Sequence, residues 1–261
     1  MLFEERYSQI VKLLEEKEFL KTSEMMDTFG ISHETARRDL EVLQERGFAR
    51  RIRGGAVYVQ PKEKNQSSHE YEFHRENLAA AKVASRLVKP GSFIYLDAGR
   101  TVAHLAGFLK NTPNLNIVTP NMLVVNEVGN CPNIRLHILA GEFDSDENII
   151  RGQHTEDSFV AFNFDIAFMS CGGLSLTSGK INDYDNSGLK RRLIKEHTDK
   201  FVLVMNSSKI NKSFPMNLFD AREMDAIIVD SNIQPEDEEI LRSFCPEVII
   251  ADISEIPEEK N

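Results

Sequence analysis

The chain has 261 residues, of which 41% are hydrophobic, with few glycines and prolines. This composition is typical of a globular protein with one large or two ordinary domains. No stretch approaches the roughly eighteen apolar residues that a membrane span needs, and the Glu-rich N-terminus is unlike a secretory signal. Three widely spaced cysteines argue against a disulfide framework. Together these features predict a cytoplasmic protein with no membrane partner.

The net charge of −10 argues against nucleic-acid binding when it is taken over the whole chain, but the charge is distributed unevenly. Residues 1–60 hold 10 basic and 11 acidic residues, so the acidic excess belongs to the rest of the chain. Residues 37–53 contain six arginines against three acids. The basic charge is therefore concentrated in one short segment, and the acidic remainder would limit adhesion to nucleic acid elsewhere.

Three helices are predicted in the first 47 residues. Apolar residues recur with a helical period from Tyr7 to Leu14, which predicts the first helix. A second helix would begin with Thr22 or Ser23 as its N-cap and end at Gly30. Ser32 would cap a third helix that ends at Gly47. Three helices with a short glycine-containing turn before the last predict a helix-turn-helix.

The third helix sorts its residues onto two faces. Ala36, Leu40 and Leu43 form one apolar stripe, which leaves a polar face opposite. Residues near the N-terminal end of such a helix meet base edges in the major groove, where arginine binds guanine or phosphate. The residues of this segment predicted to contact DNA are Ser32, His33, Glu34, Thr35, Arg37 and Arg38.

A β-hairpin is predicted directly after the third helix. Strand-forming residues flank Gly54-Gly55, a pair that suits a tight turn with positive φ. Such a wing would present its arginines to the DNA backbone or minor groove. The wing residues predicted to contact DNA are Arg50, Arg51, Arg53, Gly54 and Gly55. An arginine-rich solvated face is the alternative, but the order of all these elements favours a DNA interface.

Residues 35–56 resemble the winged helix-turn-helix of the DeoR family of bacterial repressors of sugar metabolism, whose signature reads roughly T-x-R-R-D-L-x-x-L-x-x-x-G-x-x-x-R-x-H-G-G-A. The matching residues are Thr35, Arg37, Arg38, Asp39, Leu40, Leu43, Gly47, Arg51, Gly54, Gly55 and Ala56. The chain departs from the signature at Ala36, where Ile is usual, and at Arg53, where His is usual. The resemblance implies a protein that binds double-stranded operator DNA.

A second domain follows a polar linker. The predicted boundaries are a DNA-binding domain over 1–59, a linker over 60–74, an α/β domain over 75–252 and an acidic tail over 253–261. The second domain alternates apolar strand-like runs with helical segments, which predicts an open α/β fold with a mainly parallel sheet. The predicted strands cover residues 92–97, 115–119, 134–141, 164–173, 200–208, 225–231 and 247–252.

Polar and glycine-rich residues follow several of these strands. Ligands of open α/β sheets bind beyond the carboxyl ends of the strands, and a glycine-containing turn into a helix presents free N–H groups to an anion. Taken alone, each such turn is most often just a turn; together they predict a site for a small anionic polyol. The candidate effector-binding residues are Asp97, Ala98, Gly99, Arg100, Thr101, Thr119, Asn121, Gly141, Gly172, Gly173, Lys190 and Lys209.

This half resembles the effector domain of the DeoR family, which is related in fold to ribose-5-phosphate isomerase. The family's D-S-G-T-T loop corresponds to residues 97–101, its T-N-S to residues 119–121, its E-A-x-x-K-R to residues 186–191 and its D-S-S-K to residues 206–209. The chain departs with Arg100 in place of Thr and Asn206 in place of Asp. The resemblance implies control by a phosphorylated sugar. No cofactor is predicted. A homodimer or homotetramer is expected because one recognition helix specifies only a few base pairs.

Two other functions are alternatives to a regulator. An isomerase-like enzyme would need a carboxylate base, for which Asp97, Asp183 and Asp185 are the candidates, but no paired acidic motif supports them. Alternatively, the second domain would only assemble subunits of a DNA-binding protein. The segment starting at Asp183 copies the beginning of a calcium loop but has Ile194 at position twelve, so no metal site is predicted. We therefore predict a transcriptional regulator, a repressor of a carbohydrate uptake or catabolism operon, and no catalytic residues.

Overall fold

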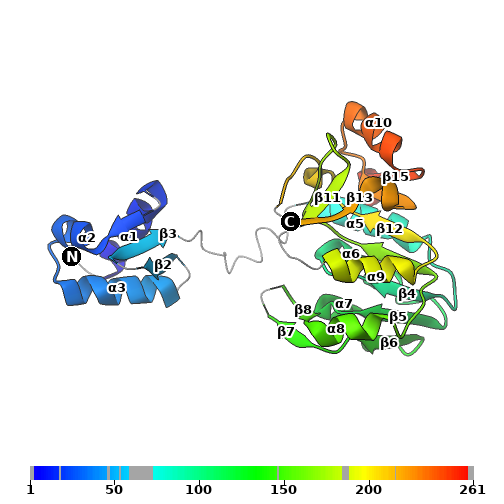
Figure 1. The fold of residues 1–261 in the computed structure, drawn as a ribbon, viewed down its shortest axis with the longest axis horizontal. Coiled ribbons are helices and arrows are strands. Elements are labelled where there is room, and N and C mark those ends of the chain that lie inside the picture. The colour runs from blue at the N-terminus through cyan, green and yellow to red at the C-terminus, as the bar shows by residue number, and fades with distance from the viewer. Residues whose placement is uncertain are drawn as a thin grey trace. The chain divides into compact units, whose positions relative to one another are not determined.

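The structure is a computed structural model that describes residues 3–17, 19–45, 48–52, 54–58, 73–145, 147–183, 188–214 and 216–257. The chain divides into two compact units, Met1–Glu72 and Phe73–Asn261 (Figure 1). Residues 60–72 of the predicted linker, Gly47 at the predicted helix end and residues 258–261 of the predicted tail lie outside the described residues.

The smaller unit contains three helices and a small antiparallel sheet. Its helices are α1 (Phe3–Lys17), α2 (Thr22–Phe29) and α3 (His33–Glu45), and its strands are β1 (Phe19–Lys21), β2 (Ala49–Ile52) and β3 (Gly55–Tyr58). The sheet order is β1-β3-β2. The three helices and the hairpin confirm the sequence prediction of a winged helix-turn-helix. The three-residue strand β1 was not predicted, because so short a segment shows no period.

Only one of the two predicted ends of α2 is confirmed. Gly30 adopts a left-handed conformation with φ of 62° and ends α2, as predicted. The N-cap of α2 is Lys21 rather than Thr22 or Ser23, and no side chain caps this helix end. The capping prediction was wrong here because β1 runs directly into the helix.

One buried ion pair joins the first and third helices. Asp39 is only 4% exposed, although it lies between the buried apolar positions of α3. Its carboxylate accepts hydrogen bonds from Arg6 Nε at 2.6 Å and Nη2 at 3.2 Å. The hydrogen bond to Asp39 raises the pKa of Arg6. Removing one partner of such a pair leaves an uncompensated charge, so the pair fixes α3 against α1.

The hairpin turn lies one residue earlier than predicted. Ile52 pairs with Gly55, so the chain reverses between these two residues, and Gly54 has a φ of 92°. Gly55 itself is buried in β3, where it pairs with Ile52 on one side and Lys21 on the other. Only the first glycine of the pair therefore serves the turn, because a two-residue connection leaves the second in the ladder.

The larger unit is built on a seven-stranded sheet in which every neighbouring pair is parallel. The strand order is β15-β14-β12-β9-β4-β5-β6. The strands are β4 (Phe93–Leu96), β5 (Leu115–Thr119), β6 (Ile134–Ile138), β9 (Ile166–Met169), β12 (Phe201–Val204), β14 (Ala226–Asp230) and β15 (Val248–Ala251). The predicted α/β fold and all seven predicted strands are confirmed.

Helices cover both faces of this sheet (Figure 1). One face packs on α5 (His74–Ser85), α6 (Arg100–Phe108) and α7 (Met122–Val128) through a shared apolar cluster. A second cluster on the other face includes residues of α8 (Gln153–Phe159), α9 (Gly188–Glu196) and α10 (Pro235–Phe244). The short 3-10 helices are η1 (Ser207–Lys209), η2 (Ala221–Glu223) and η3 (Ile253–Glu255).

The strand order defines one position that favours ligand binding. From β4 the chain adds β5 and β6 on one side, then returns to add β9 and the later strands on the other. The connections that leave β4 and β9 therefore diverge to opposite faces. In open α/β sheets, ligands bind beyond the carboxyl ends of the strands at such a switch point.

Two smaller antiparallel sheets and the last helical turn complete the unit. The strands β7 (Glu142–Asp144) and β8 (Ile149–Arg151) form a hairpin, and β10 (Gly173–Leu174), β11 (Lys180–Asp183) and β13 (Met216–Asp220) form a three-stranded sheet. The structure differs from the predicted tail boundary, because residues 253–255 form η3 and Ile256 is buried in the cluster with α5.

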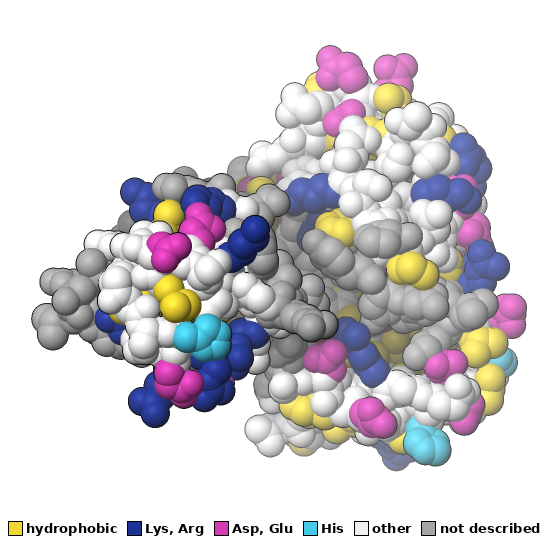
Figure 2. All heavy atoms as spheres, turned by 60° about the vertical axis from the view of Figure 1, so that its left-hand side comes forward, with side chains coloured by type: hydrophobic (Ala, Val, Ile, Leu, Met, Phe, Trp, Pro, Cys, Tyr) yellow, Lys and Arg dark blue, Asp and Glu magenta, His cyan; other side chains and the backbone are white. Residues whose placement is uncertain are grey.

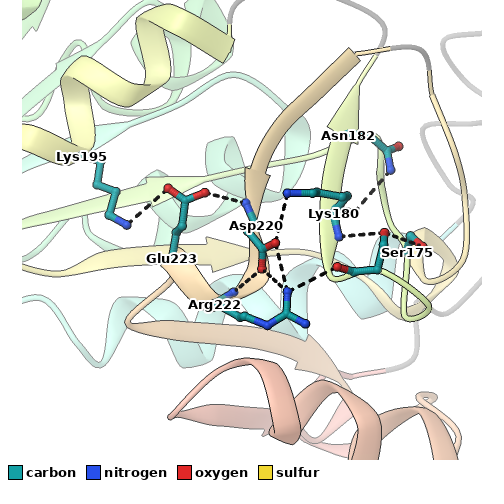
Figure 3. Close-up of polar contacts among 8 residues, drawn as sticks. Ser175, Lys180, Asn182, Lys195, Asp220, Arg222 and Glu223 are labelled. Carbon is teal, nitrogen blue, oxygen red and sulfur yellow. Dashed lines mark hydrogen bonds and ion pairs between the residues drawn. The ribbon is translucent and has the colours of Figure 1, made fainter.

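Asp220 joins several of these peripheral elements (Figure 3). Its carboxylate accepts hydrogen bonds from the backbone N–H of Arg222 at 3.0 Å, from Arg222 Nη1 at 2.9 Å and from Lys180 Nζ at 3.2 Å. Glu223 accepts from the Asp220 N–H at 2.8 Å and pairs with Lys195 of α9 at 3.6 Å. Burial raises the pKa of Asp220, but the hydrogen bonds from Arg222 and Lys180 outweigh this effect and lower the pKa.

The lowered pKa predicts how Asp220 contributes to stability. A carboxyl group whose pKa is lower in the folded state stabilises the fold at pH values above its unfolded-state pKa. That contribution is lost as the pH falls through the folded-state pKa. We expect Asp220→Asn to cost about 1 kcal/mol at pH 7 and less below about pH 4. Urea unfolding of the larger unit at pH 7 and pH 3 measures this difference. The exposed Asp199→Asn is the control, and an equal cost of Asp220→Asn at both pH values would contradict the assignment.

Candidate functional site

The first turn of α3 is fixed by its cap. Ser32 Oγ accepts a hydrogen bond from the Thr35 N–H at 3.2 Å and lies 2.9 Å from Thr35 Oγ1, which confirms Ser32 as the predicted cap. His33 and Glu34 are exposed at the start of the helix, and Thr35 is half-buried beside the cap. The N-terminal end of α3 thus presents short polar side chains on a fixed backbone.

Exposed ion pairs join α3 to the wing. Arg37 binds Glu34 at 2.9 Å and Glu41 at 2.8 Å, and Arg51 of β2 binds the same Glu41 oxygen at 2.7 Å. The backbone N–H of Arg51 also donates to Gln44 Oε1 at 2.9 Å. The hydrogen bond from Arg37 lowers the pKa of Glu34. Exposed pairs of this kind are worth little in water, so a phosphate could compete for both arginines.

Arg38 differs from these two arginines. Its side chain is exposed on α3 and has no ion pair within the described part of the chain. Figure 2 shows Lys and Arg side chains beside acidic ones on the surface of this unit. Arg38 is therefore the arginine of α3 most available to a base or phosphate.

The remaining wing residues have different positions. Gly54 is exposed at the hairpin turn. Gly55 is buried in the central strand of the small sheet, so it has no surface to offer DNA, in contrast to the prediction. Arg50 lies in β2, but its side chain is outside the described residues, as is the whole of Arg53. These two stay predictions.

In the larger unit, Asp97 lies at the switch point of the sheet. It follows β4, is 3% exposed, and its N–H donates to the carbonyl of Phe168 in β9 at 3.0 Å. Its carboxylate accepts from Tyr95 Oη at 3.2 Å and from the Ser170 N–H at 3.5 Å. The predicted Asp97 is thus placed where the carboxyl ends of β4 and β9 meet.

Thr119 and Asn121 hold the loop that follows Asp97. Both are fully buried. Asn121 Nδ2 donates to the carbonyls of Asp97 and Gly99 at 3.1 and 3.0 Å, and its Oδ1 accepts from the Leu123 N–H at the start of α7. Thr119 Oγ1 donates to the Leu96 carbonyl and accepts from the Asn121 N–H. Both side chains therefore hold the loop in place, and their predicted contacts to an effector stay predictions.

Glycine is required at position 99 because the loop after β4 passes close to Ser170. It has a φ of 98° and is the N-cap of α6, and a Cβ there would lie 2.6 Å from Ser170 Oγ. Ala98 and Arg100 on either side are half-buried. The first N–H groups of a helix have no partner within it, so the start of α6 is suited to an anion.

A carboxamide from α5 connects this loop to the end of β12. Asn77 Oδ1 accepts from Thr101 Oγ1 and from Asn206 Nδ2, both at 2.8 Å. Asn206 Oδ1 in turn accepts from the N–H and hydroxyl of Ser208. Lys209 lies in η1, half-buried and without an ion pair among the described residues. Sequence reasoning missed Asn77, since it lies in an Ala-rich helix and belongs to no motif.

Three further predicted effector residues, Gly141, Gly172 and Gly173, follow the carboxyl ends of β6 and β9. A Cβ on Gly141 would lie 2.3 Å from the Arg151 carbonyl, and Cβ atoms on Gly172 and Gly173 would lie 2.8 Å from Phe214 and 2.3 Å from the Lys212 carbonyl. Close packing thus favours glycine at these three positions, and their predicted contacts to an effector stay predictions. The side chain of Lys190 lies outside the described residues, as does Asp185, one of the carboxylates weighed as a base.

Comparison with known proteins identifies the family. Residues 6–62 match the DeoR-like helix-turn-helix domain, and residues 72–231 match the DeoR C terminal sensor domain. The chain therefore belongs to the DeoR family of DNA-binding transcriptional regulators, as the sequence motifs predicted. Within the described residues, no helix is long and apolar enough to span a bilayer.

Named relatives are similar over nearly the whole chain. The uncharacterized HTH-type transcriptional regulator YulB of Bacillus subtilis is 29% identical over 90% of this chain and 92% of its own. The transcriptional repressor AccR of Agrobacterium fabrum is 27% identical over 95% and 97%. The glycerol-3-phosphate regulon repressor of Escherichia coli is 28% identical over 87% and 90%. These relatives are transcriptional regulators, which supports the prediction of a regulator rather than an enzyme.

Among solved structures, ribose 5-phosphate isomerase A from Methanocaldococcus jannaschii is similar with a TM-score of 0.37 and 19% identity, covering 53% of this chain and 55% of its own. The eIF2B beta subunit from Chaetomium thermophilum has a TM-score of 0.47 and 8% identity, covering 68% and 56%.

The exposed Arg38 yields a prediction for DNA binding. We expect Arg38→Ala to weaken binding of the full chain to its operator by about 1–3 kcal/mol, since the side chain would lose a bidentate base contact. Arg37→Ala should cost less, because Arg37 must first leave Glu34 and Glu41. Fluorescence anisotropy with a labelled operator fragment measures both. Equal affinities of Arg38→Ala and the wild type would remove Arg38 from the interface.

Proposed function

We propose that this regulator represses a carbohydrate uptake or catabolism operon in the cytoplasm and that a phosphorylated sugar at the carboxyl edge of the sheet controls its binding to the operator. The observation that carries the proposal is the convergence of anion-binding and hydroxyl-binding groups at the switch point. The same edge is where ligands bind in open α/β sheets.

The phosphate would lie at the start of α6. The partial positive charge of a helix N-terminus and its unpaired N–H groups favour a phosphate. Arg100 is the first residue of α6, and Lys209 lies in η1. Asn77 binds both Thr101 and Asn206 at 2.8 Å, so one carboxamide bridges the two segments that carry these cations.

The sugar hydroxyls would meet the acceptors and donors around this position. Asp97 offers a carboxylate, and Ser208 follows Asn206 at the end of β12. A phosphorylated sugar or polyol carries both kinds of group, an anion and hydroxyls, on one small molecule. A relative 28% identical to this chain is named for glycerol 3-phosphate, a compound of this class.

Two DNA-binding units are needed for a specific site. A single recognition helix contacts only a few base pairs, so symmetric dimers or tetramers on repeated half-sites are the usual solution. The effector would favour the conformation of the oligomer that cannot place two such units on the operator together.

A binding experiment tests the proposal. Labelled fragments from upstream of the chain's own coding region and neighbouring genes are titrated with the full chain at several salt concentrations, with and without glycerol 3-phosphate, fructose 1-phosphate or ribose 5-phosphate. We expect one fragment to bind with a steep salt dependence and one phosphorylated compound to lower its affinity. Unphosphorylated glycerol, fructose and ribose are the controls. Binding unaffected by any phosphorylated compound would favour a second unit that only assembles subunits.

Lys209 gives the matching mutational prediction. Lys209→Ala should leave the affinity for the operator unchanged. The concentration of the active sugar phosphate needed to halve operator binding should rise at least about tenfold, because a charge-assisted contact to phosphate is lost. The exposed Lys212→Ala, three residues away, is the matched control. If the response of Lys209→Ala equals that of the wild type, the anion binds elsewhere.

A further inference from the structure

Asn77 connects α5 to two strand ends at once. Its Oδ1 accepts hydrogen bonds from Thr101, which follows β4, and from Asn206, which follows β12. In the sheet, β9 lies between these two strands. One carboxamide of α5 therefore spans the switch point of the sheet.

The direction of these hydrogen bonds is fixed by the backbone. The Ser208 N–H can only donate, so Asn206 must turn its Oδ1 toward it and its Nδ2 toward Asn77. Asn77 must then present its oxygen, and the Thr101 hydroxyl must donate to that oxygen. The family motif D-S-S-K has an aspartate where this chain has Asn206, and an ionised carboxylate could not donate to Asn77.

The neighbours of Asn77 on α5 contact further strand ends. Arg75 Nη2 donates to the carbonyls of Ile253 and Ile256, beyond β15, at 3.4 and 3.1 Å. Glu76 accepts from Asn232, beyond β14, at 3.0 Å. The first turn of α5 is thus anchored on the ends of four strands. This helix is also the first element after residues 59–72, through which the chain leads from the DNA-binding unit.

A ligand at this edge that accepts from the Thr101 hydroxyl must compete with Asn77. Thr101 is 8% exposed and Asn206 is 4% exposed, and the hydrogen bonds that each of them donates in the structure go to Asn77. The Thr101 hydroxyl has one hydrogen to donate, so a phosphate or hydroxyl that accepts it takes that hydrogen bond from the α5 carboxamide. Binding through the Thr101 hydroxyl and anchoring of α5 on Thr101 are therefore mutually exclusive.

We infer that Asn77 is the positioning residue that couples the effector edge to the DNA-binding unit. Without effector, its oxygen anchors the first turn of α5. A bound phosphorylated sugar takes over the Thr101 hydroxyl and so weakens the anchoring of that turn, which carries the connection to the DNA-binding unit. The inference rests on the proposed function.

The variant Asn77→Leu tests this coupling, because leucine matches the size of asparagine but accepts no hydrogen bond. The full chain is titrated calorimetrically with whichever of glycerol 3-phosphate, fructose 1-phosphate and ribose 5-phosphate alters operator binding of the wild type. We expect the compound to bind Asn77→Leu roughly threefold to tenfold more tightly, since its competitor is gone. The effect of the compound on operator affinity should shrink, because α5 lacks the Asn77 contact whether or not the compound is bound. General loss of structure would weaken both.

Two further variants complete the experiment. Asn77→Asp keeps an acceptor for Thr101 and Asn206, so it should retain the effector's influence on operator binding while binding the anionic compound more weakly. Asn126→Leu changes an exposed asparagine of α7 and should alter neither quantity. If Asn77→Leu keeps the wild-type effector affinity and the wild-type response of operator binding, the inference is overturned but the proposed function is not. The same holds if Asn77→Leu loses effector affinity and response in parallel. A wild-type chain that responds to none of the compounds would overturn the proposed function and this inference together.

Discussion

The larger unit depends on one constraint: polar groups buried at the carboxyl edge of its sheet must bind one another. Asp97, Thr119, Asn121 and Asn206 are all buried, and unpaired polar groups in such positions are costly. Asn121 meets the constraint by binding the two carbonyls of the loop after β4. That contact sets the loop that leads through Gly99 into α6, and so it places the N–H groups proposed to bind phosphate.

A similar constraint orients the recognition helix in the smaller unit. The ion pair between Arg6 and Asp39 fixes α3 from its buried side, where charge cannot be left uncompensated. On the exposed side, Glu41 binds arginines of both α3 and β2. The buried contact gives the helix its position, whereas the exposed contacts can be exchanged for phosphates at little cost. The buried pair thus fixes the position of the helix, and the exposed pairs are the ones predicted to give way to DNA.

The features that a local sequence pattern determines, such as strands and helix caps, could be predicted from the sequence. Apolar runs predicted all seven strands of the large sheet, and Ser32 was identified as a cap because its partner lies three residues away. Pairings between distant segments could not be predicted in this way. Asp39 binds a residue 33 positions earlier, and Asn77 binds one 129 positions later, so neither contact leaves a periodic signal. The sequence identified the motif around Thr119 and Asn121, but only the structure shows that both side chains are buried and support the loop.

Operator DNA and a phosphorylated sugar are proposed to bind different conformations of the same protein, so that each ligand weakens binding of the other. Thermodynamic linkage then requires that the factor by which the sugar phosphate lowers operator affinity equal the factor by which operator DNA lowers sugar-phosphate affinity. The most direct measurement is calorimetric titration of the full chain with the active compound, in the presence and absence of saturating operator. We predict weaker binding to the DNA complex by the same factor. Identical sugar-phosphate affinities for the free and DNA-bound protein would contradict the account.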